Sequence, residues 1–196
     1  MNYLIYLAAG SARRFGSNKL LALWRGRPLF VWGLSALEKA AAGRRDCRVV
    51  VVSRWPEILA EARVRGCLAV ESPRSGEGLS YTIRAALESL PAGEGGYYLF
   101  AVADQPGLSG RTVARLLEAA DRGALAATLW LGNHPGSPTL FSASLRGQLL
   151  ALEGDEGGRK VLEGCGGRCL RIPAESAGEL WDVDRPEDLK REEQNP

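Results

Sequence analysis

A loop near the N-terminus, residues 10–19, combines glycines and cations in a pattern that suits a polyphosphate. Gly10 and Gly16 bracket two arginines, and Lys19 follows three residues after the second glycine. Backbone N–H groups exposed on a glycine-rich loop, together with nearby cations, can cradle phosphate oxygens. The small residues that end at Gly10 let a ligand approach the main chain closely. The alternative is a turn between a strand and a helix whose arginines face only solvent.

The spacing of the loop excludes two well-known phosphate-binding motifs. A Walker A loop has four residues between its glycines and Lys-Ser or Lys-Thr directly after, whereas five residues separate Gly10 from Gly16 and Ser17 comes next. The dinucleotide fingerprint Gly-x-Gly-x-x-Gly is also absent, because positions 12 and 15 are Ala and Phe. A phosphate-binding role would therefore use a different loop framework.

Aspartates after two expected strands are candidates for binding a metal ion. Asp104 follows the apolar run 97–102, and a carboxylate at the tip of a buried strand is costly unless it is solvated, paired or bound to a cation. Mg²⁺ prefers few carboxylates plus phosphate oxygens, although Asp104 could instead form a turn or cap a helix. Asp182 lies two residues before Asp184, on the same face of an extended strand. We expect Asp184 to cap a helix with Pro186 in its first turn.

The apolar runs predict an α/β fold, a Rossmann-like three-layer α/β/α sandwich with a mostly parallel sheet. The expected strands are 3–6, 47–53, 67–70, 97–102 and 124–131, and the expected helices are 29–42, 55–65, one ending near residue 90, and 110–122. Strands that alternate with helices favour parallel pairing through right-handed crossovers. In such sheets ligands bind at the carboxyl ends of the strands. We expect residues 1–190 to form a single domain and 191–196 to fray.

Composition restricts the remaining function classes. The chain has 196 residues and a formal net charge of +2, which gives no general surface for nucleic acid or membrane. The sequence predicts neither a signal peptide nor a membrane span, and we expect a cytoplasmic protein with reduced cysteines. Cys165 and Cys169 form an isolated pair, and the only histidine is His134. A zinc site would need further ligands beside that pair.

The segment Leu7-Ala8-Ala9-Gly10-x-Ala-x-Arg14-Phe-Gly16-x-x-Lys19 resembles the N-terminal signature of the MobA-like nucleotidyltransferases. That group includes the molybdenum cofactor cytidylyltransferases and guanylyltransferases and has the nucleotide-diphospho-sugar transferase type of fold. The resemblance implies that the loop wraps the triphosphate of an NTP. It also implies that catalytic Arg14 and Lys19 neutralise the reacting phosphates, while residues 7–10 contact base and ribose.

Two further segments resemble the nucleotide and metal sites of the same family. The residues of the first that match a segment near the nucleobase and α-phosphate are Gly78, Leu79, Ser80 and Thr82. Without the family, this segment is simply the start of an amphipathic helix. Asp104-Gln105-Pro106 matches the family's metal-binding signature, and Asp182 resembles its second metal ligand. The resemblance therefore implies Mg²⁺ held by Asp104 and Asp182.

Of two segments expected near the acceptor substrate, one resembles the molybdopterin cytidylyltransferase branch and the other departs from it. The segment 153–162 matches that branch and implies that Asp155 and Arg159 border the acceptor. Physically, Asp155 can cap a helix that starts near residue 157, while Arg159 can reach a phosphate or remain solvated. The segment 132–141 departs from the branch, because Ser137 stands where His or Asn is usual. His134 either substitutes from a shifted loop or lies on the surface.

The resemblance as a whole implies an Mg²⁺-dependent nucleotidyl transfer. The phosphate of an acceptor attacks the α-phosphorus of the NTP and releases pyrophosphate. Leu-Ala-Ala-Gly is closer to the cytidylyltransferases than to the guanylyltransferases, which implies CTP as donor, molybdopterin as acceptor and a molybdoenzyme as the partner that receives the product. The alternatives are the same chemistry with another NTP and acceptor, such as GTP with molybdopterin or a sugar or alditol phosphate, or a non-catalytic nucleotide-binding protein.

Overall fold

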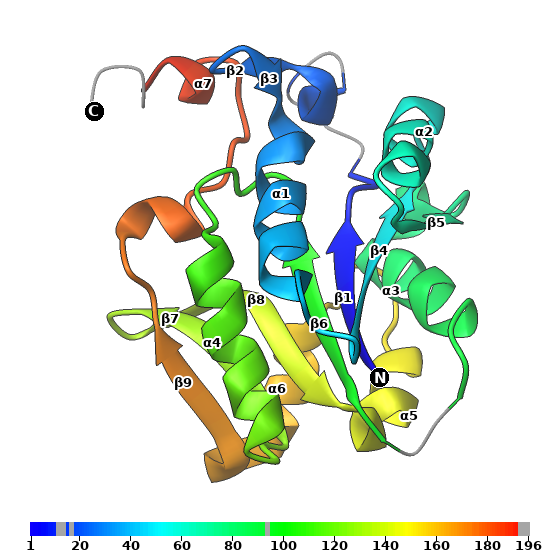
Figure 1. Cartoon of the computed structure of the whole chain (residues 1–196), viewed down its shortest axis with the longest axis vertical. Coiled ribbons are helices and arrows are strands. Elements are labelled where there is room, and N and C mark those ends of the chain that lie inside the picture. Colours follow the sequence, from blue (N-terminus) through cyan, green and yellow to red (C-terminus); the bar gives the residue numbers. More distant parts are fainter. Residues whose placement is uncertain (11–14, 16–17, 93–94, 192–196) are drawn as a thin grey trace.

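A seven-stranded sheet with helices on both faces forms the centre of the computed structural model (Figure 1), which describes residues 1–10, 15, 18–92 and 95–191. The strand order is β5-β4-β1-β6-β8-β7-β9. The strands are β1 (Asn2–Leu7), β4 (Cys47–Ser53), β5 (Leu68–Glu71), β6 (Tyr97–Val102), β7 (Ala126–Leu131), β8 (His134–Ser142) and β9 (Cys169–Pro173), and a separate hairpin joins β2 (Leu23–Trp24) to β3 (Arg27–Pro28).

The sheet is mostly parallel, as the sequence predicted. The strands β4 and β6 both pair parallel to β1, β5 pairs parallel to β4, and β9 pairs parallel to β7. Only β8 runs antiparallel to its neighbours, between β6 and β7. Apolar and β-branched runs such as 49–52 are buried from both faces, which is typical of the central strands of a parallel sheet.

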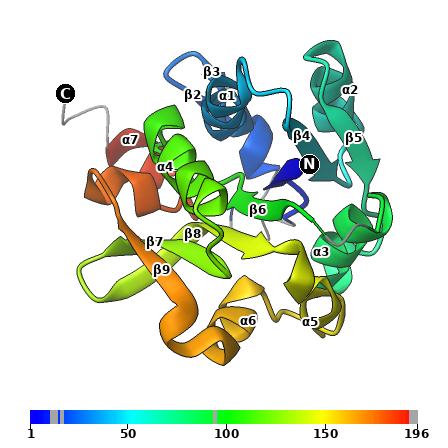
Figure 2. The same ribbon diagram turned by 60° about the horizontal axis from the view of Figure 1, so that its bottom comes forward.

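The helices divide between the two faces of the sheet (Figure 2). The first face packs against α1 (Leu29–Ala41), α2 (Pro56–Val64) and α4 (Gly110–Asp121). The opposite face packs against α3 (Leu79–Glu88), α5 (Arg146–Leu150) and α6 (Gly158–Cys165). Alternate residues of β1 serve the two layers, because successive side chains of a strand point to opposite faces: Leu4 and Tyr6 join the first core, and Ile5 and Leu7 the second.

Short helices occupy the connections near the carboxyl ends of the strands. They are the 3₁₀ helices Lys19–Leu21, Ser75–Glu77 and Ala177–Leu180, together with the C-terminal α7 (Asp188–Arg191). Two further 3₁₀ turns, Ala143–Leu145 and Gly166–Arg168, flank α5 and α6. The segment before α7 reaches the β2–β3 hairpin, where the Trp24 and Trp181 rings are 6.2 Å apart. The segment that follows β9 thus packs against the hairpin that follows the N-terminal loop.

The segment around Asp184 differs from the expected helix start. No helix begins at Asp184, and α7 starts at Asp188 with Pro186 in the preceding turn. The capping contact runs in the opposite direction, since Asp188 Oδ2 accepts from the backbone N–H groups of Asp184 (2.9 Å) and Arg185 (2.8 Å). The expectation that Asp184 caps a helix is therefore wrong, and its carboxylate is available for other contacts.

Candidate active site

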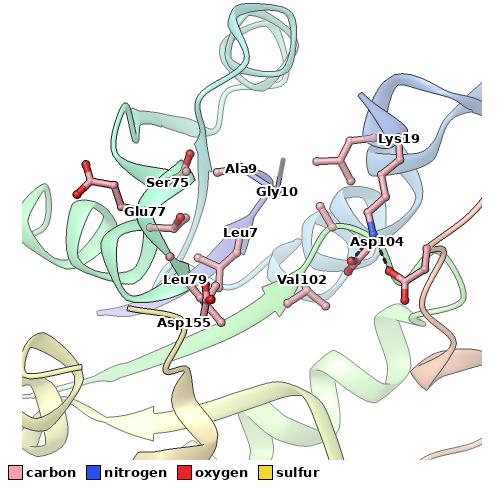
Figure 3. A pocket seen from close by; sticks show the side chains of 16 residues that line it. Leu7, Ala9, Gly10, Lys19, Ser75, Glu77, Leu79, Val102, Asp104 and Asp155 are labelled. Carbon is pink, nitrogen blue, oxygen red and sulfur yellow. Dashed lines mark hydrogen bonds and ion pairs between the residues drawn. The ribbon is translucent and has the colours of Figure 1, made fainter. Parts of the chain in front are cut away.

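A cavity of about 700 Å³ opens beside the carboxyl ends of β1 and β6 (Figure 3). Its lining comes from six parts of the chain: residues within 7–10, residues 19–20, residues within 75–82, residues 102–104, Asp155 and Asp184. The register of the sheet explains this meeting, because Leu7 at the end of β1 is level with Val52 of β4 and Val102 of β6. The volume is in the range of small-molecule binding sites.

Hydrogen bonds fix the end of β1 at the floor of this cavity. The Leu7 carbonyl accepts from the Ala103 N–H (3.2 Å), and the Ala8 carbonyl accepts from Ser53 Oγ (2.7 Å). The buried Tyr6 hydroxyl donates to the Phe30 carbonyl at 2.7 Å. These contacts join β1 to both neighbouring strands and to α1, so they hold in place the residues from which the glycine loop begins.

Lys19 is the only cation that lines the cavity in the described part of the chain, and it is surrounded by acceptors. Its Nζ donates to Asp104 Oδ2 (2.9 Å), to the Val183 carbonyl (2.7 Å) and to Asp184 Oδ1 (3.2 Å). Burial lowers the pKa of Lys19, but the charge of Asp104 and hydrogen bonds to both aspartates outweigh it and raise the pKa above 10.5. Lys19 is therefore a fixed positive charge at one end of the cavity.

Local capping explains how Lys19 reaches this position. Asn18 is the N-cap of the short helix Lys19–Leu21, and its Oδ1 accepts from the Leu20 N–H at 3.1 Å. Leu20 is buried in the core below. The helix thereby holds the Lys19 side chain toward the tip of β6, where the Asp104 carbonyl in turn accepts from the Val183 N–H (2.9 Å).

Asp182 lies beside this junction without lining the cavity. Its Oδ1 accepts from Gln105 Nε2 at 2.9 Å. Burial, followed by the charge of Asp104, raises the pKa of Asp182, and the charge of Asp184 adds to the same effect. Three carboxylates thus lie close enough to interact, and the two that contact Lys19 are Asp104 and Asp184.

The opposite wall of the cavity is formed by the turn before α3 and its first residues. Gly78 has a φ of +143°, and a Cβ there would lie 2.2 Å from the Gly154 carbonyl oxygen. That oxygen accepts from the Ser80 N–H at 3.0 Å. Only glycine fits at position 78, because the loop that carries Asp155 packs directly against its backbone. Glu77 faces the cavity with its carboxylate bound twice by Arg74, at 2.8 and 2.7 Å.

The structure brings most of the expected site residues to one place. The expected residues that line the cavity are Leu7, Ala9, Gly10, Lys19, Gly78, Leu79, Thr82, Asp104 and Asp155. Ala8 and Ser80 are buried behind this surface, at 0% and 1% exposure. Arg14 and Gly16 lie outside the described residues.

The acceptor-side residues are separated in the structure. Asp155 lines the cavity, whereas the Arg159 side chain is 78% exposed and pairs with Glu163 Oε1 at 3.5 Å. Asp155 does not cap α6, because the N-cap residue is Gly157 and no side chain makes a capping hydrogen bond there; that expectation is wrong. Ser137 Oγ accepts from the Val102 N–H at 3.2 Å, and His134 is exposed at the start of β8.

Asp184 is a candidate site residue that sequence reasoning missed, because the pattern around it predicted a helix cap instead. The sequence held one indication of this role. Asp184 follows Asp182 at a spacing that puts both side chains on one face of a strand, so either carboxylate could face the site. The backbone bond from Val183 to Asp104 decides which one does. Because that bond aligns the segment with the tip of β6, Asp184 reaches Lys19 and Asp182 reaches Gln105.

The donor set at this end fits a hard divalent cation. Among the described residues no group of three or more His, Cys, Asp and Glu side chains is arranged to hold a metal ion. Mg²⁺ does not need such a group, since it usually takes one or two carboxylates and completes its shell with water and substrate phosphates. Asp104 and Asp184 offer carboxylate oxygens directly at the cavity, and Asp182 is adjacent.

Comparison with known proteins places the chain in a family. Residues 4–171 match the model of the MobA-like NTP transferase domain. The purine catabolism protein PucB of Bacillus subtilis is 32% identical over 199 residues, which cover 94% of this chain and 92% of PucB. A probable molybdenum cofactor guanylyltransferase of Bacillus licheniformis is 30% identical over 114 residues, covering 57% of this chain and 53% of its own.

Solved structures share the fold over nearly the whole length. Rv0371c of Mycobacterium tuberculosis superimposes with a TM-score of 0.78 at 21% identity, covering 96% of this chain and 95% of that one. A nucleotidyl transferase from Methanothermobacter gives a TM-score of 0.78 at 23% identity, covering 97% and 95%. The matched region contains the loop at 7–19, Asp104 and Asp155, all in the domain that defines the family. The chain therefore belongs to the MobA-like NTP transferase family and is a nucleotidyltransferase.

Proposed function

We propose that this protein transfers CMP from CTP to the phosphate of molybdopterin and releases pyrophosphate, with Mg²⁺ as its metal ion. The observation that carries the proposal is the junction of Lys19 with Asp104 and Asp184 at one end of a cavity that Leu7 and Leu79 line at the other end. The charged end suits the phosphates of an NTP, and the wall formed by Leu7 and Leu79 suits its base.

The reaction forms one bond and breaks one. An oxygen of the acceptor phosphate attacks the α-phosphorus, and the bond from this phosphorus to the bridging oxygen breaks, so that pyrophosphate leaves with the electron pair. The protein contributes positioning and charge stabilisation rather than covalent chemistry. Lys19 would bind the oxygens of the α-phosphate and the departing pyrophosphate, while Asp104 and Val183 orient its ammonium group. Arg14 would bind the same phosphates.

The carboxylates at this end would hold the metal ion. Asp104 is the first ligand that we propose, and the second comes from the pair Asp182 and Asp184. When bound, Mg²⁺ would neutralise and polarise the phosphate oxygens. A solved structure of Rv0371c is a manganese complex, with a TM-score of 0.67 at 22% identity to this chain. Asp104 and Asp184 would also keep Lys19 ionised and directed into the cavity.

The choice of CTP and molybdopterin is supported by sequence motifs. The Leu7–Gly10 segment and the 153–162 segment resemble the cytidylyltransferase branch, and Asp155 and Arg159 would border the acceptor if they act as in that branch. The probable guanylyltransferase of B. licheniformis favours GMP transfer to the same acceptor as the second candidate. The product would pass to a molybdoenzyme in the cytoplasm, a compartment that suits the four free cysteines of the chain.

Pyrophosphate release with purified molybdopterin and each of CTP, GTP, ATP and UTP in the presence of Mg²⁺ tests the proposal. We expect turnover with CTP, and we expect Asp104→Asn to reduce kcat/KM by about 10²- to 10³-fold, as for loss of one preorganised electrostatic group. Asp121→Asn is the matched control, because this exposed aspartate pairs with Arg44 away from the cavity. Turnover with GTP alone would select the second candidate, and no release with any NTP would refute the enzymatic proposal.

The same assay separates the two candidates for the second metal ligand. Asp182→Asn and Asp184→Asn remove one charge each at positions two residues apart. We expect the variant that has lost a metal ligand to require a higher Mg²⁺ concentration for half-maximal rate, while the other variant keeps the wild-type dependence. Unchanged Mg²⁺ dependence in both variants would show that Asp104 is the sole protein ligand.

A further inference from the structure

The cavity has two ends of different chemistry (Figure 3). Lys19, Asp104 and Asp184 form the charged end, which the proposed function assigns to phosphates and metal. Leu7 and Leu79 form the other end, and Figure 3 shows Asp155 with them, on the side away from Lys19. A carboxylate therefore lies at the end where an aromatic base, rather than a phosphate, would bind.

The position of Asp155 is determined by α3. The Gly154 carbonyl accepts from the Ser80 N–H, and a Cβ on Gly157 would lie 2.8 Å from a methyl carbon of Leu79. Arg84 of α3 reinforces this attachment, because its guanidinium donates to the carbonyls of residues 150 and 152 at 3.3 and 3.0 Å. The loop that carries Asp155 is thus held against the same helix that supplies the nucleotide wall.

Asp155 also differs from the other carboxylates of the cavity in its ion pairing. Asp104 and Asp184 both contact Lys19, and Glu77 is bound by Arg74. Within the described residues, the Asp155 carboxylate has no ion pair with any cation. An unpaired negative charge repels a phosphate, so a favourable partner for Asp155 is a neutral group that donates hydrogen bonds.

We propose that Asp155 selects the nucleobase by accepting a hydrogen bond from an exocyclic amino group, the N4 amino group of cytosine in the proposed reaction. Aspartate and glutamate accept from cytosine N4 in known nucleic-acid recognition, whereas the 4-position of a uracil or thymine ring carries an oxygen acceptor. Two acceptors facing each other at this position would disfavour UTP. This inference rests on the proposed function and adds the group that sets its base preference.

Binding measurements on Asp155→Ala and Asp155→Asn test the inference. Dissociation constants for CTP, UTP and inorganic triphosphate are measured by calorimetry with Mg²⁺ present. A hydrogen bond to a charged group accounts for about a 10- to 100-fold change in affinity, so we expect Asp155→Ala to weaken CTP binding by that factor. Inorganic triphosphate should bind as in the wild type, and UTP should bind at least as tightly, because the acceptor that opposes its oxygen is gone. We expect Asp155→Asn to reduce the ratio of CTP affinity to UTP affinity, because the asparagine amide can donate to the uracil oxygen.

Two controls distinguish this effect from misfolding and from a general change of charge. Glu153→Ala removes a neighbouring exposed carboxylate that does not line the cavity, and should leave all affinities unchanged. Inorganic triphosphate has no base, so a loss of its binding in Asp155→Ala would indicate a perturbed phosphate site and overturn the inference. Melting temperatures without ligand show whether each variant is folded.

The outcomes separate this inference from the proposed function. A wild-type preference for CTP that survives in Asp155→Ala would overturn the role of Asp155 and leave the proposed function intact. The role of Asp155 in base selection would also be overturned if the Asp155→Ala variant kept its base preference but required more molybdopterin for half-maximal rate. Asp155 would then contact the acceptor, and the proposed function would stand. Absence of binding of any NTP to the wild-type protein would refute both.

Discussion

Replacing Lys19 by methionine should destabilise the protein and, at the same time, make it bind divalent cations more readily without nucleotide. Methionine keeps much of the length of the side chain but removes the hydrogen bonds to Asp104, Val183 and Asp184. Loss of a partner from a fully buried ion pair costs about 3–5 kcal/mol. Here water can solvate the remaining charges, since the Asp104 and Asp184 side chains are 27% and 57% exposed.

The expected cost is therefore about 1–2 kcal/mol in free energy of unfolding, close to one hydrogen bond to a charged group. For a chain of this size that corresponds to a melting temperature lower by about 2–8 °C. Because the folded-state pKa of Lys19 is raised, its stabilisation is complete at neutral pH and is lost only as the pH rises through that pKa, above 10.5. The difference between wild type and variant should therefore be constant from about pH 6 to 9.

The metal response supplies the sharper test. In the wild type the Lys19 ammonium group contacts both carboxylates and offsets one of their two negative charges, so a divalent cation must compete with it. Without that group, Mg²⁺ or Mn²⁺ alone should raise the melting temperature more in the variant than in the wild type. Lys160→Met is the control, because this exposed lysine of α6 pairs with Glu156 away from the cavity, and the change should cost under about 0.5 kcal/mol. Equal melting temperatures for wild type and Lys19→Met, with equal metal responses, would refute the described junction.

Two further predictions concern the framework of the site, and a third concerns a cysteine outside it. Gly78→Ala should cost roughly 2–4 kcal/mol and abolish NTP binding in calorimetry, because its Cβ would overlap the Gly154 carbonyl. Gly154→Ala, at φ +52° with nothing within 4 Å, should cost only about 1–2 kcal/mol, and equal costs would argue against the contact. Tyr6→Phe should lower unfolding free energy by about 1–2 kcal/mol in urea titration, since a buried carbonyl loses its donor, and a neutral result would contradict that bond. Burial and the charge of Glu38 raise the pKa of Cys67 to about 11, so at pH 8 only about 0.1% is reactive thiolate; Glu38→Gln should lower that pKa and speed alkylation measured by mass spectrometry.

The main strands could be predicted from the sequence because their apolar runs are continuous. The β-branched run in β4 and the aromatic run in β6 admit few alternatives, and the predicted strands 3–6, 47–53 and 97–102 correspond to β1, β4 and β6. Their alternation with amphipathic helices gave the parallel pairing and thus the edge where the cavity lies. The glycine loop and Asp104 could be placed at that edge for the same reason.

The antiparallel strand β8 could not be predicted in the same way. Glycine and two prolines between residues 134 and 138 are typical of a loop, yet this stretch pairs with β7 through a two-residue turn at 132–133. Tertiary pairing on both sides overrides the weak local propensity. The contact of Asp184 with Lys19 was equally hidden, since it joins residues far apart in the chain and depends on the Val183–Asp104 backbone bond.

The junction around Lys19 joins parts of the polypeptide that a ribosome produces at very different times. Lys19 is made early and Asp104 midway, but Val183 and Asp184 follow only after every strand of the sheet. A nascent chain therefore presents the Lys19 ammonium with one of its three acceptors until translation has passed residue 184. A product terminated before Val183 would contain all the strands but lack two acceptors that orient the cation, so nucleotide binding would report completed synthesis.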